Sequence, residues 1–285
     1  MHRVAFQGDR GAFSEEAARG LLGVAVETLP CRSFEQTFAS VSEGRADCAV
    51  LPIENALAGS VHRNYDLLEE HRLAIAREAY VRIRLDVIVP PGVELAAVRR
   101  VHSHPVALAQ CQRFLAAHPA IEPVAAWDTA GSVALVLERG DTGEAAIAGP
   151  AAAAIHGGVV VAESIEDHKR NYTRFLLLTP PDRVAGHQEG TWPRWKTSVV
   201  FRTPDRAGAL FRALAAFALR DVNLSKIESR PIEGRPWEYS FHLDVSGRRG
   251  DEPVDRALAH LDEMAESLRI LGSYPAADAP LEGPG

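Results

Sequence analysis

The sequence contains only three cysteines, Cys31, Cys48 and Cys111, in a chain of 285 residues. They lie far apart and in no metal-ligand spacing, so neither a zinc site nor a closed disulfide framework is indicated. Thiols packed as small apolar groups suit a reducing compartment, and we expect a cytoplasmic chain. No apolar run reaches the roughly 18 residues of a membrane span, and the first residues lack the apolar stretch of a secretory signal.

Several common catalytic motifs are also absent. The sequence has no His-Glu-x-x-His, no Walker loop and no Gly-x-Ser-x-Gly elbow, and the turn at Gly8–Gly11 lacks the third glycine of a dinucleotide fingerprint. The net charge of −7 argues against a nucleic acid as partner, because phosphate binding needs a basic face. We therefore expect no cofactor, no metal, and neither a nucleic-acid nor a membrane partner.

Residues 3–178 alternate short apolar strands with helical patterns, which indicates an α/β fold with a mostly parallel sheet. The apolar run at 73–89 is long for one strand, and we interpret it as a strand that passes between two lobes. The chain would return near residues 164–175. The prediction is a catalytic-size domain over residues 1–180, with a cleft between one lobe at 1–79 plus 164–180 and another at 80–163.

A smaller domain is predicted after this one. The polar stretch at 181–195 contains Pro and Gly and is typical of a linker. The order βαββαβ over residues 196–274 indicates a ferredoxin-like unit. Apolar and polar residues alternate from Trp237 to Val245, as in a half-buried strand. The last residues, 275–285, are rich in Pro, Ala and Gly, and we expect a disordered tail.

Small polar residues stand at several predicted helix starts of the first domain, at Gly8–Gly11, Ser103–Pro105 and Asp128–Ser132. Helix N-termini carry unpaired N–H groups and partial positive charge, so they hold anions. If these ends face one cleft, they suit a small dicarboxylate. The alternative is ordinary helix capping, which uses the same residue types.

Two strand ends offer further candidates. Glu54 and Asn55 follow a buried strand at its C-terminal end, which faces the ligand crevice in open α/β sheets. They are either site groups or turn formers. Thr173 offers a hydrogen bond or a proton, and Arg174 offers a two-point contact to a carboxylate. The plainer alternative is a strand-edge threonine and a surface arginine.

Taken together, these segments resemble the prephenate dehydratase family over nearly the whole chain. The motifs that carry the resemblance are Ala5–Gly8 with Gly11–Ala18, Leu51–Asn55, Gly59–Val61 with Asp66–Leu68, His102–Pro105 with Gln110–Cys111, Asp128–Gly131, and Asn171–Phe175. The C-terminal unit resembles an ACT domain through Gly208–Phe211 and Glu228–Pro231. Each motif alone is weak, and their order and spacing make the match specific.

The resemblance implies a cofactor-free enzyme of phenylalanine biosynthesis whose two-lobed catalytic domain is like a periplasmic binding protein. It would convert prephenate to phenylpyruvate with loss of carbon dioxide and the ring hydroxyl. By similarity, Thr173 is the leading catalytic residue, and Asn55, Ser103 and Gln110 orient the substrate. Further substrate contacts are expected from Arg174, Thr129, Glu54, His104 and Phe175.

The ACT resemblance implies that phenylalanine binds between paired domains of two subunits and lowers the activity. The expected contact residues are Ala209, Leu210, Asn223, Leu224, Glu228 and Ser229. The alternative is that these residues only shape the strands and helices. A homodimer is expected, and a tetramer is the other option.

Two departures from the family pattern leave alternatives open. Ala56 stands where many relatives have serine, and Asp128 stands where bacterial relatives often have serine. Asp-Thr-Ala-Gly at Asp128 also resembles the plant arogenate dehydratases. Arogenate carries an amino group in place of the side-chain keto oxygen, and a carboxylate near the cleft favours that ammonium group. A third hypothesis is a non-catalytic two-lobed receptor or amino-acid sensor, which would not need the site residues named above.

Overall fold

The computed structural model describes residues 2–232, 234–235, 237–277 and 280–281. The chain forms two compact units, which are described separately below. The first contains residues 2–61 and 79–175 with the strand at 280–281, and the second contains residues 62–78 and 176–277. Residues 62–78, predicted as part of the first lobe, therefore belong to the second unit.

The first sheet has the strand order β16-β5-β11-β3-β1-β2, with β4 paired to β3. Its strands are β1 (Arg3–Gln7), β2 (Glu27–Cys31), β3 (Cys48–Asn55), β4 (Gly59–Ser60), β5 (Ala74–Arg82), β11 (Tyr172–Thr179) and β16 (Pro280–Leu281). The sequence between these strands supplies α1 (Phe13–Leu22) and α2 (Phe34–Ser42). β1 is parallel to both β2 and β3, as the strand-helix alternation predicted.

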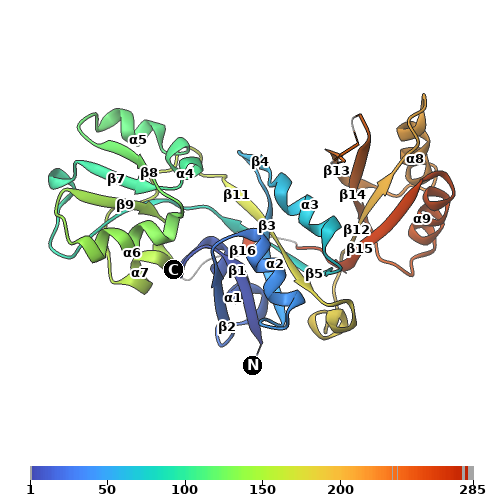
Figure 1. Cartoon of the computed structure of the whole chain (residues 1–285), viewed down its shortest axis with the longest axis horizontal. Helices are drawn as coiled ribbons and strands as arrows, with labels where there is room; N and C mark the ends of the chain where they lie inside the picture. The colour runs from blue at the N-terminus through green and yellow to red at the C-terminus, as the bar shows by residue number, and fades with distance from the viewer. Residues whose placement is uncertain (1, 233, 236, 278–279, 282–285) are drawn as a thin grey trace. The chain divides into compact units, whose positions relative to one another are not determined.

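The second sheet of this unit has the order β10-β6-β9-β7-β8. Its strands are β6 (Asp86–Val89), β7 (Arg100–Ser103), β8 (Glu122–Ala125), β9 (Glu144–Ala148) and β10 (Val159–Ala162), and η1 (Leu95–Ala97) precedes β7. Helices α4 (Pro105–Ala109) and α5 (Gln112–Ala117) lie on one side, and α6 (Thr129–Arg139) and α7 (Pro150–His156) on the other (Figure 1). Alternate residues of β9 face the two sides: Ile147 belongs to the apolar core under α4 and α5, and Ala146 to the core under α6 and α7.

Two local expectations for these strands were wrong. The apolar run at 73–89 is not one strand but β5 and β6, separated by residues 83–85. The tail was expected to be disordered, yet Pro280 and Leu281 pair in parallel with Tyr80 and Val81 of β5. Pro275 is the last residue of β15, and the N–H groups of Ala276 and Ala277 donate to the Arg194 carbonyl oxygen (3.0 Å) and to Glu78 Oε1 (3.0 Å). The rest of that expectation concerns residues 278–279 and 282–285, which lie outside the described residues.

The second unit contains the predicted βαββαβ order as an antiparallel sheet, β13-β14-β12-β15. Its elements are α3 (His62–Glu70), η2 (Pro181–His187), β12 (Trp195–Arg202), α8 (Ala209–Ala218), β13 (Leu224–Pro231), β14 (Tyr239–Ser246), α9 (Glu252–Met264) and β15 (Ser267–Pro275). Helices α8 and α9 cover one face (Figure 1), where Val199, Phe201 and Leu243 form the core. No helix of the described residues combines the length and apolar character of a membrane crossing.

The other face of this sheet is polar but buried. Ser240, His242 and Asp244 of β14 are 2%, 4% and 7% exposed, so the prediction of a half-buried strand is wrong. The reason is α3, because its Glu69 carboxylate accepts hydrogen bonds from Ser240 Oγ (2.5 Å) and His242 Nε2 (3.1 Å). A polar residue stays buried when such partners replace water.

Glu69 makes the stability of this unit sensitive to acid. Burial by itself would raise the pKa of Glu69, but hydrogen bonds from His242 and Ser240 outweigh it and lower the pKa from 4.5 to about 2. Because the folded pKa lies below the unfolded one, the stabilisation is present above about pH 4.5 and is lost as pH falls towards about 2. We expect Glu69→Gln to reduce the free energy of unfolding by about 1–3 kcal/mol near neutral pH.

The measurement is urea unfolding of the native chain and of Glu69→Gln at several pH values. The difference in free energy between the two proteins should shrink as the pH is lowered below about 4.5. A difference that stays constant over that range would show that the Glu69 carboxylate does not carry the stabilisation.

Candidate active site

The first unit contains a cavity of about 560 Å³ that is lined by residues from both of its sheets. We call it the Thr173 cavity. The predicted site residues that line it are Asn55, His104, Gln110, Thr129, Thr173 and Phe175. They come from the ends of β3 and β11 on one side and from α4 and α6 on the other. The cavity has the size of a small-molecule site.

A chain of side-chain hydrogen bonds runs along one wall of this cavity. Asn171 Nδ2 donates to Gln110 Oε1 (2.8 Å), and Asn171 Oδ1 accepts from Asn55 Nδ2 (2.8 Å). Asn55 Nδ2 also donates to Thr173 Oγ1 (2.9 Å). Asn171 is fully buried and was not among the predicted site residues. The signal was present, because residues two apart on a strand share a face and Asn171 stands two before Thr173.

The orientation of Asn55 fixes what the Thr173 hydroxyl does. Asn55 Oδ1 accepts the backbone N–H groups of Leu57 (3.0 Å) and Ala58 (2.8 Å), so its amide NH₂ must face Thr173. Thr173 Oγ1 therefore acts as acceptor towards Asn55, and its own hydrogen is left to donate. No acceptor for that hydrogen is found among the described residues, and Thr173 lines the cavity.

Three predicted site residues do not line the cavity. Ser103 is fully buried and donates to the Ile147 carbonyl oxygen (2.6 Å). Arg174 is 3% exposed and its Nη1 lies 3.2 Å from Glu54 Oε1. Alternation along each strand explains the pair, because Arg174 and Glu54 point away from the face that carries Thr173 and Asn55.

The two longer helices of this region begin at the cavity. Ala12, Phe13 and Ser14 line it at the start of α1, and Asp128, Thr129 and Ala130 at the start of α6. The capping alternative is also real, since Asp128 Oδ2 accepts from Gly131 N (2.7 Å). The same oxygen accepts from Asp9 N (3.2 Å), which joins the two sheets of the unit.

Gly11 and Glu15 set the approach of α1 to the second sheet. Gly11 has φ +86°, and a Cβ there would lie 2.5 Å from Ala152 Cα, so only glycine fits. Burial would raise the pKa of Glu15, but hydrogen bonds from the Gly11 N–H (2.7 Å), Arg19 and Thr28 lower the pKa. The ionised Glu15 therefore fixes the turn that precedes α1.

His104 and Cys111 differ in the chemistry that they offer to the cavity. His104 Nδ1 accepts the Val106 N–H at 3.3 Å, which leaves Nε2 as the ring nitrogen that carries hydrogen in the neutral form. Cys111, next to Gln110, is fully buried, and burial raises the pKa of its thiol to about 12. Cys111 stays protonated and is a packing residue, whereas His104 offers a donor to the cavity.

Comparison with known proteins agrees with this geometry. The family model for prephenate dehydratase matches residues 4–183, and the model for the ACT domain matches residues 197–263. The chain belongs to the prephenate dehydratase family. A chloroplastic arogenate dehydratase/prephenate dehydratase of Arabidopsis thaliana is 43% identical, covering 96% of this chain and 72% of the relative.

Solved structures of high similarity include a prephenate dehydratase of Arthrobacter aurescens in complex with L-Phe. It is 37% identical, with a TM-score of 0.86, covering 99% of this chain and 93% of that one. Another, GqqA, described as a novel type of quorum quenching acylase, is 36% identical, with a TM-score of 0.84, covering 96% and 98%. The predicted family and its ACT domain are confirmed.

The structure places the six predicted effector residues at separate points of the ACT domain. Ala209 and Leu210 begin α8, and Asn223 and Leu224 stand at the start of β13. Ser229 is exposed on β13, while Glu228 Oε1 lies 3.2 Å from His62 Nε2 of α3. Their role in binding an effector stays a prediction.

Proposed function

We propose that this chain catalyses the decarboxylative dehydration of prephenate to phenylpyruvate. The observation that supports it most is the Thr173 hydroxyl, which Asn55 holds as acceptor so that its hydrogen is free to donate in the cavity. In this reaction the ring carboxylate leaves as CO₂ and its electron pair enters the ring. The C–O bond to the ring hydroxyl breaks, and the departing oxygen needs a hydrogen-bond donor and finally a proton to become water.

The other walls of the cavity suit the remaining parts of prephenate. Phe13, Phe34 and Phe175 offer apolar contact to the cyclohexadiene ring. The starts of α1 and α6 offer backbone N–H groups and positive dipole ends to carboxylates. Gln110 and Asn171 hold Asn55 in place, so they act on the reaction through Thr173. We propose that Glu54 and Arg174 support β3 and β11 behind this wall, and that Ser103 supports β7 and β9 of the second sheet.

The test is a spectrophotometric assay of the purified chain with prephenate, reading the formation of phenylpyruvate. We expect turnover without added metal or organic cofactor. Because a similar structure is described as an acylase, an acyl amide is a useful second compound. Cleavage of the acyl amide with no phenylpyruvate from prephenate would contradict the proposal.

Arogenate is a second candidate substrate, and Asp128 is the observation that favours it. The Asp128 carboxylate lines the Thr173 cavity, where it offers negative charge to an ammonium group. The Arabidopsis relative carries both substrate names. The two activities are separated by kcat/KM for prephenate and for arogenate under the same conditions, and a higher value for arogenate would reverse the assignment.

We also propose that phenylalanine binds the ACT domain and lowers the activity, and that the chain works as a homodimer or homotetramer. The Arthrobacter relative was solved with L-Phe. Phe211 and Ile227 of the ACT domain are 75% and 48% exposed, which suits burial against a second copy. Three buried free cysteines support a reducing, cytoplasmic location. A phenylalanine titration without change in rate or melting temperature would contradict the regulation, and light scattering gives the oligomeric state.

A further inference from the structure

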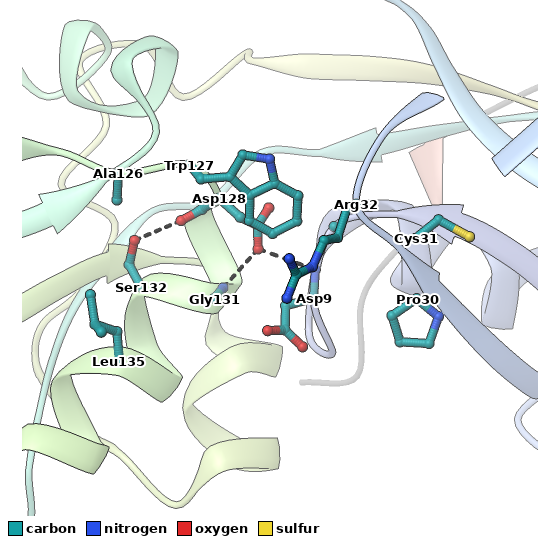
Figure 2. A pocket seen from close by; sticks show the side chains of 11 residues that line it. Asp9, Pro30, Cys31, Arg32, Ala126, Trp127, Asp128, Gly131, Ser132 and Leu135 are labelled. Carbon is teal, nitrogen blue, oxygen red and sulfur yellow. Dashed lines mark hydrogen bonds between the residues drawn. The ribbon is translucent and has the colours of Figure 1, made fainter. Parts of the chain in front are cut away.

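A second cavity of about 710 Å³ lies in the first unit, next to the Thr173 cavity. We call it the Arg32 cavity. The two share Trp127 and Asp128, so one wall separates them. Figure 2 shows Arg32 extending from the end of β2 towards the segment that carries Trp127 and Asp128. Trp127 is 53% exposed, so its indole is open to a ligand in either cavity.

A cationic side chain distinguishes the two cavities, since Arg32 lines the second one beside the carboxylates of Asp9 and Asp128. Among the described residues that line the Thr173 cavity, none is a lysine or an arginine. Arg32 is exposed in the adjoining cavity, and no described acceptor pairs with its guanidinium, because only its backbone N–H is engaged, by Gln36. A chain of net charge −7 repels a dianion, so a single unpaired guanidinium beside the site has a large local effect.

We propose that the Arg32 cavity is an entry site, where Arg32 binds a carboxylate of the dianionic substrate before it reaches Thr173. This inference rests on the proposed function. Arg32 stands in a neighbouring cavity and acts on capture alone, so it contributes to kcat/KM and not to the chemical step. Trp127 adds an aromatic face beside the guanidinium for the substrate ring.

The test compares Arg32→Gln with Arg113→Gln. Arg113 is an exposed arginine of α5 that lines neither cavity, so its variant has the same change in net charge. We expect Arg32→Gln to lower kcat/KM for prephenate about threefold to tenfold at low ionic strength. Its kcat should be unchanged, and the deficit should shrink as salt is added.

The control Arg113→Gln should follow the native chain at every salt concentration. Equal kcat/KM and equal salt dependence for both variants would overturn the entry site while leaving the proposed function intact. A native chain that does not convert prephenate would instead remove the proposed function. Arg32→Lys should keep most of the salt-dependent gain, since it retains the charge.

A second, independent observation concerns α3, which covers the polar face of the ACT sheet. Asp66 Oδ1 and Oδ2 accept from Arg230 Nε (3.0 Å) and Nη2 (3.1 Å), a two-point ion pair. Glu69, one turn later, accepts from Arg202 Nη2 (3.1 Å) as well as from His242 and Ser240. The helix is thus held to β12, β13 and β14 by charged hydrogen bonds.

The Asp66–Arg230 pair lies between the predicted effector residues of β13 and the chain segment that leads into the Thr173 cavity. Arg230 follows Glu228 and Ser229, the predicted effector residues of β13. α3 begins at His62, directly after Gly59–Val61, which line the Thr173 cavity. A displacement of β13 would act on α3 through this ion pair, and α3 is joined directly to residues that line the cavity. We infer that the Asp66–Arg230 pair transmits phenylalanine binding to the catalytic site, an inference that rests on the proposed regulation.

The test is inhibition by phenylalanine of Asp66→Asn, with Arg249→Gln as control, since Arg249 pairs with Asp255 away from α3. We expect Asp66→Asn to keep its basal kcat/KM within about twofold and to need about tenfold more phenylalanine for half inhibition. The double variant Asp66→Arg with Arg230→Asp should recover part of the response. Unchanged melting temperature in the absence of phenylalanine shows that the fold is intact.

If Asp66→Asn were inhibited by the same phenylalanine concentrations as the native chain, the role of the ion pair would be overturned and the proposed regulation would still stand. A native chain that does not respond to phenylalanine would remove the regulation itself, and this inference with it. Equal loss of inhibition in Arg249→Gln would also overturn it, because the effect would then not be specific to α3.

Discussion

Thr173→Ala is expected to lower kcat for prephenate by about a hundredfold to a thousandfold, the range found for removing one well-placed donor. The reason is geometric. Asn55 Nδ2 donates to Thr173 Oγ1 at 2.9 Å, so the hydroxyl hydrogen is the only part of this side chain left to meet the departing oxygen. KM should change by less than about threefold, because the ring and carboxylate contacts are made by other residues.

Thr173→Ser is the matched control, since it keeps the hydroxyl and removes only a methyl group. It should retain most of kcat, and steady-state kinetics with prephenate measures both variants. Because Thr173 is 8% exposed, the melting temperature of each variant must be compared with that of the native chain. If Thr173→Ala turned over prephenate at the native rate, Thr173 would have no part in the reaction.

Asn55→Asp should be nearly as harmful, about a hundredfold in kcat, although it changes one NH₂ group into an oxygen. The aspartate oxygen that replaces Oδ1 still accepts from Leu57 N and Ala58 N, so the loop keeps its shape. The other oxygen then faces Thr173 Oγ1 and Asn171 Oδ1, both acceptors in the native structure. The Thr173 hydroxyl would turn to donate to it, and its hydrogen would be lost to the substrate.

The pH dependence separates this reversal from simple damage to the fold. Protonation of an aspartate at position 55 restores a donor, so the activity of Asn55→Asp should rise as the pH is lowered through the pKa of that carboxyl group. The native chain, with a neutral asparagine, should lack this rise. A variant as inactive at low pH as at neutral pH, with a native melting temperature, would contradict the proposed orientation of the Thr173 hydroxyl.

The sequence predicted the residues on the cavity wall better than their individual roles. Thr173, Asn55 and Gln110 belong to separate motifs, and the structure joins them through Asn171, which belongs to the same motif as Thr173. Arg174 was expected to contact a carboxylate of the substrate because of its chemistry. Its strand position directs it to Glu54 instead, and period-two alternation was already sufficient to indicate that Thr173 and Arg174 face opposite sides.

The glycine turn with α1, and the later helix α3, show how far local sequence patterns can predict the structure. The glycine turn and the start of α1 were predicted, because turn and helix chemistry are local. That α3 would leave the first unit and cover the ACT sheet was not, and neither was the burial of Ser240, His242 and Asp244. Those polar residues alternate with apolar ones, as in a strand with one face in solvent. Only a partner distant in the sequence, Glu69, makes the burial of Ser240 and His242 favourable.

The amino-acid sequence by itself determined the α/β class, the ferredoxin-like unit, the family and six of the residues that line the cavity, since these follow from periodicity and from short motifs. Tertiary structure decided which side of a strand faces the cavity, that the hydroxyl hydrogen of Thr173 is left free to donate, and which carboxylates pair with Arg230 and His242. The physical reason is distance along the chain: hydrogen bonds between residues more than a hundred positions apart are set by packing, which no local pattern encodes.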